Sequence, residues 1–228
     1  MHPRLSWWTE ESIEWFECAS LRTDYHIRLS NEIEDLLSSC KSVIEFGCGL
    51  GYESEILKKR GYDISSFDID QNVINHAKAR TGLDIFHICD VNKNDASADA
   101  LLCINYGHIE KIDHLEVLLS HAKVRLVYVI SRHNAHGADT RPDRTEEIKT
   151  LLEEHDYRFL MKEVSMVFDQ PLKSMDEARA FIEWTYLGKN TYKYLSFVEK
   201  TDDEQYPFVF RNRKENVLFS IETKGEKR

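Results

Sequence analysis

An apolar run ends with an acid and three glycines in the stretch SVIEFGCGLGYE. Glu45 stands near the end of the run, and Gly47, Gly49 and Gly51 recur at alternate positions. Glycines at a strand-to-helix turn permit positive φ and let backbone N–H groups approach a ligand closely. The G-x-G-x-x-G spacing of a dinucleotide site would place its third glycine on Tyr52, so this turn does not fit that pattern. Because a carboxylate repels a phosphate, Glu45 favours a ligand that carries an amine or a sulfonium.

Polar side chains also end three later apolar runs. Asp68 ends the run that begins at residue 62, Asp90 follows residues 83–89, and Asn105 with Tyr106 follows residues 98–104. In an open parallel sheet, ligands bind in the crevice beyond the carboxyl ends of the strands. We therefore expect these side chains to gather around the ligand of the glycine turn.

The elements that must position these residues alternate between strands and helices. This alternation predicts a doubly wound α/β sheet in one domain, and the almost wholly apolar run at residues 124–132 fits a strand covered on both faces. The last segment, YPFVFRNRKENVLFSIET, predicts an antiparallel hairpin that finishes the sheet. Helices are expected over residues 9–19, 24–38, 52–60, 71–80, 112–122, 145–155 and 173–188, and strands over 42–46, 62–70, 83–91, 98–106, 124–132 and 157–168.

The motif ExGxGxG after a first strand resembles motif I of the class I S-adenosylmethionine-dependent methyltransferases, and the later strand ends extend the resemblance over residues 41–131. It implies methyl transfer, S-adenosyl-L-methionine as cofactor, and a Rossmann-like, mostly parallel seven-stranded sheet with N-terminal helices and the C-terminal hairpin. It also implies that Asp68 takes the ribose hydroxyls, since a carboxylate accepts two charge-strengthened hydrogen bonds from a diol. Ile69 would lie against the adenine and Asp90 would accept from its amino group. The cofactor residues implied are Glu45, Phe46, Gly47, Cys48, Gly49, Gly51, Asp68, Ile69, Asp90, Val91, Asn105, Tyr106 and, packing over the methionyl part, Tyr25.

The resemblance divides the single domain 1–228 into three parts. Residues 1–40 form an N-terminal helical lid, residues 41–131 the cofactor-binding half, and residues 132–228 the substrate-side half, with a helical insertion near 174–187. The aromatic side chains at the N-terminus, among them Trp15 and Phe16, allow two interpretations. They close over the substrate and exclude water, or they simply pack the first helix onto its neighbours.

Candidate catalytic residues lie beyond the fourth and fifth strands. Methyl transfer needs no nucleophilic side chain, because orientation supplies much of the rate, and a base helps only if the acceptor must lose a proton. His108 is the first candidate for that base, and Tyr106 and His133 are the others. A metal site at His133, His136 and Asp139 is the alternative for that loop, and no metal is predicted.

Charge and cysteine usage narrow the partners and the compartment. The net charge of −10 disfavours a nucleic-acid substrate, which needs lysine and arginine on one face. The Asn105–Tyr106 segment also lacks the two prolines of the (D/N)PPY motif of DNA amino-methylating enzymes. Five scattered cysteines without CxxC spacing predict free thiols, and no apolar run is long enough for a bilayer. We expect a cytoplasmic monomer or homodimer that methylates an O or N atom of a small molecule.

Three other classes of protein stay open at this point. One is a non-catalytic S-adenosylmethionine-binding sensor or partner subunit. Another is an aminopropyl transferase that uses the decarboxylated cofactor, although no acid-rich amine pocket is visible in the sequence. The third, a nicotinamide-dependent oxidoreductase, is disfavoured by the glycine spacing and by the charge of Glu45.

Overall fold

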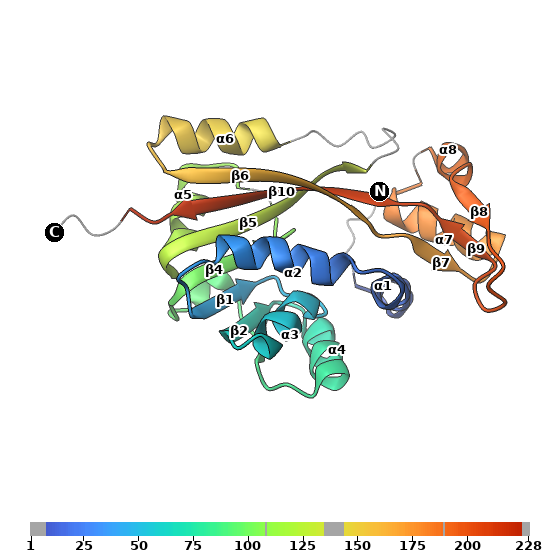
Figure 1. The fold of residues 1–228 in the computed structure, drawn as a ribbon, viewed down its shortest axis with the longest axis horizontal. Helices are drawn as coiled ribbons and strands as arrows, with labels where there is room; N and C mark the ends of the chain where they lie inside the picture. Colours follow the sequence, from blue (N-terminus) through green and yellow to red (C-terminus); the bar gives the residue numbers. More distant parts are fainter. Residues whose placement is uncertain (1–7, 108, 135–143, 189, 225–228) are drawn as a thin grey trace. The chain divides into compact units, whose positions relative to one another are not determined.

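The structure, a computed structural model, describes residues 8–107, 109–134, 144–188 and 190–224 (Figure 1). These residues form two compact units. The larger unit holds residues 27–107, 109–132, 144–164 and 216–224. The smaller unit holds residues 8–26, 133–134, 165–188 and 190–215.

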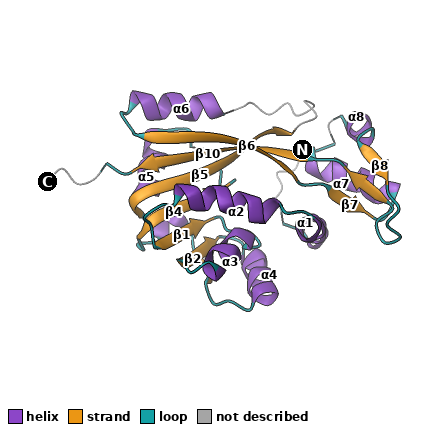
Figure 2. Cartoon of the chain, viewed as in Figure 1, coloured by secondary structure: helices purple, strands orange, loops and turns teal. Residues whose placement is uncertain are grey.

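A seven-stranded sheet is the framework of the larger unit (Figure 2), and it confirms the predicted fold class. Parallel pairing joins β1 to both β2 and β4, with Val43 opposite Ile64 on one side and Ala100 on the other. Strands β2 and β3 thus lie on one side of β1, and β4 lies on the other. The strand order reverses between β1 and β4, and such a topological switch point is where open sheets bind ligands. The order is β3-β2-β1-β4-β5-β10-β6, from β1 (Ser42–Phe46), β2 (Asp63–Asp68), β3 (Phe86–Ile88), β4 (Ala98–Ile104), β5 (Ala122–Asn134), β6 (Phe159–Val167) and β10 (Arg213–Glu222).

Strand β10 runs against its neighbours, which makes the sheet mostly rather than wholly parallel. The end of β10 meets the start of β6, where the Glu222 N–H donates to the Arg158 carbonyl at 2.9 Å. Just beyond it, the Thr223 N–H donates to the carbonyl of Val124 near the start of β5, at 3.0 Å. Figure 1 shows the same opposed direction of the β10 arrow.

The helices of this unit follow the strands in the predicted alternation. Asp70 caps α4 by accepting from the Asn72 N–H at 2.9 Å, and Gly82 ends that helix at φ +67°. Both ends match the usual preferences for an acidic N-cap and a left-handed glycine at the C-terminus. The helices are α2 (Tyr25–Leu36), α3 (Tyr52–Lys59), α4 (Gln71–Thr81), α5 (Ile112–Leu119) and α6 (Thr145–Glu154), with a 3₁₀ turn at Val91–Lys93.

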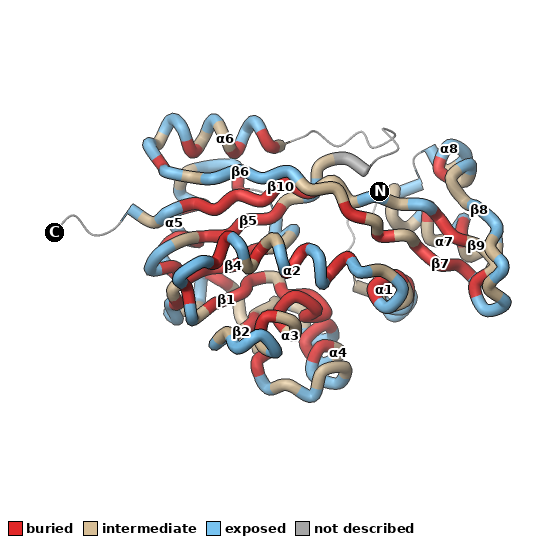
Figure 3. The backbone as a smooth tube through the Cα atoms, viewed as in Figure 1, coloured by how far each residue is buried: buried red, intermediate tan, exposed pale blue. Residues whose placement is uncertain are grey.

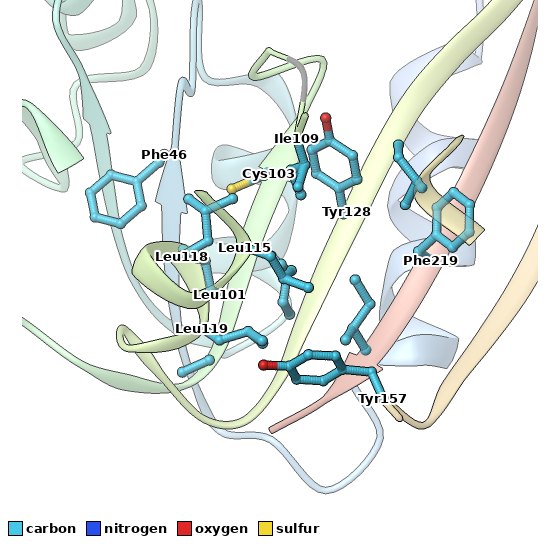
Figure 4. Packing of buried hydrophobic residues seen from close by; sticks show 14 of the residues in the cluster. Phe46, Leu101, Cys103, Ile109, Leu115, Leu118, Leu119, Tyr128, Tyr157 and Phe219 are labelled. Atoms are coloured by element: carbon cyan, nitrogen blue, oxygen red, sulfur yellow. The ribbon is translucent and has the colours of Figure 1, made fainter. Parts of the chain in front are cut away.

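Alternation along the central strands separates the two faces of the sheet. Phe46 and Cys103 point to the face that also buries Leu115 of α5 (Figure 4). Leu152 of α6 belongs to the same buried cluster. Glu45, the strand neighbour of Phe46, therefore points to the opposite face. The buried stretches in Figure 3 run along these central strands, as expected for a sheet covered on both faces.

The smaller unit has its own three-stranded antiparallel sheet, in the order β7-β9-β8, and its own apolar core. Trp15 of α1 is 4% exposed, and its indole N–H donates to Glu177 Oε1 of α7 at 3.2 Å. Its ring also packs edge-on against the ring of Phe181, with the two centroids 5.5 Å apart. Of the two interpretations, packing of the first helix onto its neighbours therefore describes Trp15. The elements are α1 (Glu10–Arg22), β7 (Gln170–Leu172), α7 (Met175–Thr185), α8 (Thr191–Leu195), β8 (Val198–Lys200) and β9 (Phe208–Phe210).

The expected C-terminal hairpin is the part of the fold prediction that needs correction. Both arms are strands, but β9 belongs to the three-stranded sheet and β10 to the seven-stranded one. Asp169 accepts from the Asn212 N–H at 2.9 Å and from Arg211 at 2.7 Å. These contacts fix the chain where it leaves one sheet for the other, so the polar segment between the arms is a crossing point and not a hairpin turn.

Candidate functional site

The glycine turn after β1 is left-handed at all three glycines. Gly47, Gly49 and Gly51 have φ values of +71°, +51° and +71°. The N–H groups of Gly47 and Cys48 donate to the Phe67 carbonyl of β2, at 2.8 and 3.1 Å. The turn is thus tied to the neighbouring strand end, and only glycine adopts such a run of positive φ at little cost.

Two of the glycines also lie against aromatic rings. A Cβ atom on Gly47 would come within 2.7 Å of Tyr106 Cδ2, and one on Gly51 within 2.3 Å of Phe86 Cε1. Phe86 is fully buried in β3, so its ring has little room to move. The backbone of the turn therefore needs glycine for space as well as for conformation.

Asp68 joins the turn to the end of β2. Its Oδ2 atom accepts from the Gly49 N–H and its Oδ1 atom from the Asp70 N–H, both at 3.0 Å. A carboxylate has about four acceptor positions, and these two backbone contacts use only two of them. The half-buried Asp68 can therefore still accept hydrogen bonds from the hydroxyl groups of a ligand. The same side chain can shape the turn and hold a sugar.

We expect Asp68→Ala to weaken binding of S-adenosylmethionine by about 1–3 kcal/mol, because charge-assisted hydrogen bonds to the ligand are lost. Calorimetric titration would measure this as a dissociation constant raised roughly tenfold to hundredfold. Asp70→Ala is the matched control, since Asp70 caps α4 through the Asn72 N–H. That variant should lose about 1 kcal/mol of stability and keep its affinity. Equal affinities for the two variants would remove Asp68 from the site.

Glu45 is buried rather than open to the crevice. It is 2% exposed and accepts a short hydrogen bond from the Ser54 hydroxyl of α3, which also contacts Ser66 of β2 at 2.6 Å. Burial, followed by repulsion from Glu53 and Asp68, raises the pKa of Glu45 to about 8, although the Ser54 hydroxyl opposes the shift. In the protein without a ligand, the Glu45 carboxyl is therefore mostly protonated at neutral pH. A nearby cation would favour its ionised form.

The residues expected around the adenine lie at the ends of β2 and β3. Ile69 is 77% exposed, an unusual position for a large apolar side chain, whereas Val91 is buried. Asp90 accepts from the backbone N–H of Asn92 at 2.9 Å and from its side-chain amide at 3.0 Å. These two hydrogen bonds lower the pKa of Asp90, so it stays ionised as an acceptor.

Asn105 and Tyr106 follow β4 in a constrained turn. Asn105 has φ +50°, and its side-chain oxygen accepts from the Ser131 N–H at 3.0 Å. The Ser131 hydroxyl lies 3.1 Å from that oxygen and 3.1 Å from the side-chain oxygen of Asn216, which links the end of β4 to β5 and β10. Burial, reinforced by Cys103, Asp90 and Asp68, raises the pKa of Tyr106 to about 12. Its phenol is therefore a hydrogen-bond donor and not a base at neutral pH.

The structure also gives the surroundings of Tyr25 and of two residues next to candidates, His26 after Tyr25 and Arg132 before His133. Tyr25 is 3% exposed in the smaller unit, where its ring packs 4.8 Å from Phe168. His26 of the same unit contacts the Ser20 hydroxyl at 2.9 Å. Arg132 forms an ion pair with Glu163. His108, His136 and Asp139 lie outside the described residues, and His133 is described only as part of β5.

Sequence reasoning missed the residues behind the turn. Ser54 donates to Glu45 and contacts Ser66. Arg80 of α4 contacts Glu55 at 2.6 Å and the Leu50 carbonyl at 3.0 Å. A serine and an arginine on amphipathic helices carry no spacing signal that separates them from surface residues. Only the helix-to-strand packing brings them to the turn.

The chemistry of this site fits S-adenosylmethionine. The turn excludes Cβ atoms at two glycines, and Glu53 and Asp68 lie close enough to Glu45 to help raise its pKa. Such a site favours a cationic ligand with a diol over a pyrophosphate. Within the described ranges, no three His, Cys, Asp or Glu side chains are grouped so as to hold a metal ion. In the same ranges, no helix has the length and apolar character required to cross a membrane.

Comparison with known proteins identifies the class. A family model described as a methyltransferase domain matches residues 21–202, which is more than half of the chain. The chain belongs to this methyltransferase domain family, and it is an S-adenosylmethionine-dependent methyltransferase. No curated protein matches the chain.

Solved structures share the fold at low sequence identity. One is the magnesium protoporphyrin IX methyltransferase of Synechocystis PCC 6803 with bound S-adenosylhomocysteine, with 12% identity, a TM-score of 0.51 and coverage of 95% of this chain and 89% of that one. The YcgJ protein of Bacillus subtilis has 10% identity, a TM-score of 0.53 and coverage of 87% and 100%. A Thermoplasma acidophilum protein has 14% identity, a TM-score of 0.51 and coverage of 90% and 89%. At these identities the likeness concerns the fold alone.

Proposed function

We propose that this methyltransferase acts on an O or N atom of a small-molecule acceptor, with the cofactor held by the glycine turn, Asp68 and Asp90. The observation that carries this proposal is the charge balance of the chain. A net charge of −10 opposes the close approach of a polyanion such as DNA or RNA. A small neutral or cationic acceptor meets no such barrier.

The turn after β4 supports the same acceptor class. The Asn105 side-chain oxygen already accepts from the Ser131 N–H at 3.0 Å and lies 3.1 Å from the Ser131 hydroxyl, so it is committed to joining β4 to β5. An amino group on a nucleic-acid base would have to compete for that oxygen. The adjacent Tyr106 phenol, whose pKa is raised to about 12, can orient an acceptor by donating a hydrogen bond.

The protein's part in the reaction is mainly to orient the acceptor and to hold its proton. When bound, S-adenosylmethionine supplies a methyl group on a cationic sulfur and leaves as a neutral thioether. A bound acceptor held in line needs no protein nucleophile. If the acceptor is a hydroxyl or a protonated amine, a base is needed. We propose His108 for that role, with His133 as the second candidate.

The function is tested by release of S-adenosylhomocysteine with two panels of acceptors. Small amines, phenols and carboxylic acids are expected to give turnover, whereas tRNA and duplex DNA are not. Turnover with a nucleic acid alone would contradict the small-molecule acceptor. Cofactor binding without turnover on either panel would favour the sensor alternative. Aminopropyl transfer would instead need the decarboxylated cofactor and release methylthioadenosine.

Once an acceptor is known, His108→Ala tests the base. We expect a loss of at least roughly a hundredfold in kcat, because a positioned base contributes about 10²–10⁴-fold. The acidic limb of the pH–rate profile should disappear with it. His114→Ala, on α5 of the larger unit, is the control, and it should keep the wild-type profile. A normal rate for His108→Ala would exclude this residue as the base.

A further inference from the structure

We infer that Arg80 is a positioning residue for cofactor binding, because it holds the glycine turn in shape from behind. The inference rests on the proposal that this turn holds S-adenosylmethionine. Arg80 belongs to the last turn of α4, a helix that supplies no residue to the motif itself. It nevertheless contacts three residues that surround Gly51.

The contacts of Arg80 are of three different kinds. Its Nη2 atom donates to the Leu50 carbonyl at 3.0 Å, and its Nη1 atom pairs with Glu55 Oε2 at 2.6 Å. Its guanidinium carbon lies 3.8 Å from the centroid of the Tyr52 ring. A planar guanidinium can donate two hydrogen bonds and stack on an aromatic ring at once, which a lysine cannot do.

The ion pair between Arg80 and Glu55 is partly buried. The side chains of Arg80 and Glu55 are 22% and 17% exposed, so water screens their ion pair only in part. Burial opposes ionisation of Glu55, but hydrogen bonds from Lys59 and Arg80 outweigh it and lower its pKa. Glu55 is therefore charged at neutral pH, and its N–H also donates to the Gly51 carbonyl at 3.0 Å.

The geometry around Gly51 shows why the turn needs this support. Gly51 is at φ +71° between Leu50 and Tyr52, and both of these neighbours are held by Arg80. Without the guanidinium, the Leu50 carbonyl would lose this donor and the turn could sample other conformations. Binding would then require the turn to be ordered again, which weakens affinity without changing the contacts to the ligand.

The test compares Arg80→Met with Arg60→Met. Arg60 is the matched control, because it stands just past the C-terminal end of α3, away from the glycine turn. It makes an ion pair with Glu34 at 2.7 Å and a hydrogen bond with Asn31 at 2.6 Å. Its side chain is 26% exposed, close to the value for Arg80. Both variants should lower the melting temperature. Only Arg80→Met should raise the dissociation constants for S-adenosylmethionine and S-adenosylhomocysteine, by roughly tenfold, with a higher KM and an unchanged kcat at saturating cofactor.

Hydrogen exchange gives a second readout that does not depend on activity. Amides of residues 47–55 should exchange faster in Arg80→Met than in Arg60→Met, in protein without cofactor. Arg80→Lys keeps the charge and should have an affinity between those of the parent and Arg80→Met. If Arg80→Met does not fold, Arg80→Lys takes its place in the comparison. Unchanged affinity and exchange in the foldable variant would overturn the inference. If Asp68→Ala also kept its affinity, the proposed cofactor site itself would be wrong, so the two failures are distinguishable.

Discussion

Gly51→Ala is expected to lose about 3 kcal/mol of unfolding free energy, from about 1–2 kcal/mol for the left-handed conformation and a similar amount for overpacking. The added methyl would lie 2.3 Å from Cε1 and 2.6 Å from Cζ of Phe86. Because that ring is fully buried in β3, the turn must move instead. Affinity for S-adenosylmethionine should fall by at least roughly tenfold, since the displaced backbone is the part of the motif that approaches the ligand.

Gly82→Ala is the control for this variant. Gly82 has φ +67°, close to the +71° of Gly51, but a Cβ atom there would meet nothing within 4 Å. It should therefore show only the conformational cost, about 1–2 kcal/mol, and full cofactor affinity. Urea unfolding and calorimetric titration measure both quantities. Equal losses for the two variants would mean that the contact with Phe86 has no energetic importance.

The alternation of strands and helices, and the gathering of polar side chains at the glycine turn, could be predicted from the sequence because their signals are local. Apolar runs, helix ends and glycines repeat within a few residues, so the strands, their alternation with helices and the turn at Gly47, Gly49 and Gly51 follow from short-range rules. The carboxyl ends of parallel strands then share one edge. That rule is sufficient to place Asp68 and Tyr106 near the turn.

The role of Glu45 could not be read in the same way. Its position before the glycines suggests an open carboxylate for a cationic ligand. Alternation in the strand instead points it to the face away from Phe46, where it accepts from Ser54, which in turn contacts Ser66. Those contacts depend on how α3 packs across β1 and β2, which the sequence does not specify.

The hairpin error has a related cause. Two β-rich arms around a polar turn are the usual pattern of a hairpin, and β9 and β10 satisfy it. Their separation depends on Asp169, which lies far away in sequence and accepts from Arg211 and the Asn212 N–H. Short-range patterns detect strands reliably, but they do not report which sheet a strand joins.

Glu45→Gln is expected to make the protein more stable, and increasingly so as the pH rises. The pKa of Glu45 is raised to about 8 in the folded protein, mainly by burial. The unfolded chain releases the same proton near the ordinary value of about 4.3. Between these values the native state binds more protons, so the contribution of Glu45 is fully present below about pH 4 and is lost as the pH rises through 8.

The size of this effect follows from the shift. Each pKa unit corresponds to about 1.4 kcal/mol, so Glu45 should reduce the unfolding free energy by on the order of 4 kcal/mol between pH 5 and pH 8. Glutamine keeps an acceptor for the Ser54 hydroxyl and has no proton to lose. The stability difference between Glu45→Gln and the parent should therefore be small at pH 5 and several kcal/mol at pH 8. Urea unfolding of both proteins across this range measures it directly.

Glu55→Gln provides the control, because the pKa of Glu55 is lowered and its contribution is lost only as the pH falls below about 4. Its stability difference from the parent should be flat between pH 5 and pH 8.

Binding of the cofactor should also change the protonation of Glu45. Because a cationic ligand favours ionised Glu45, binding of S-adenosylmethionine to the parent should release a proton near neutral pH, and binding to Glu45→Gln should not. A proton release that persists in Glu45→Gln would place the titrating group elsewhere, and a pH-independent stability difference would show that this carboxyl is ionised in the folded protein.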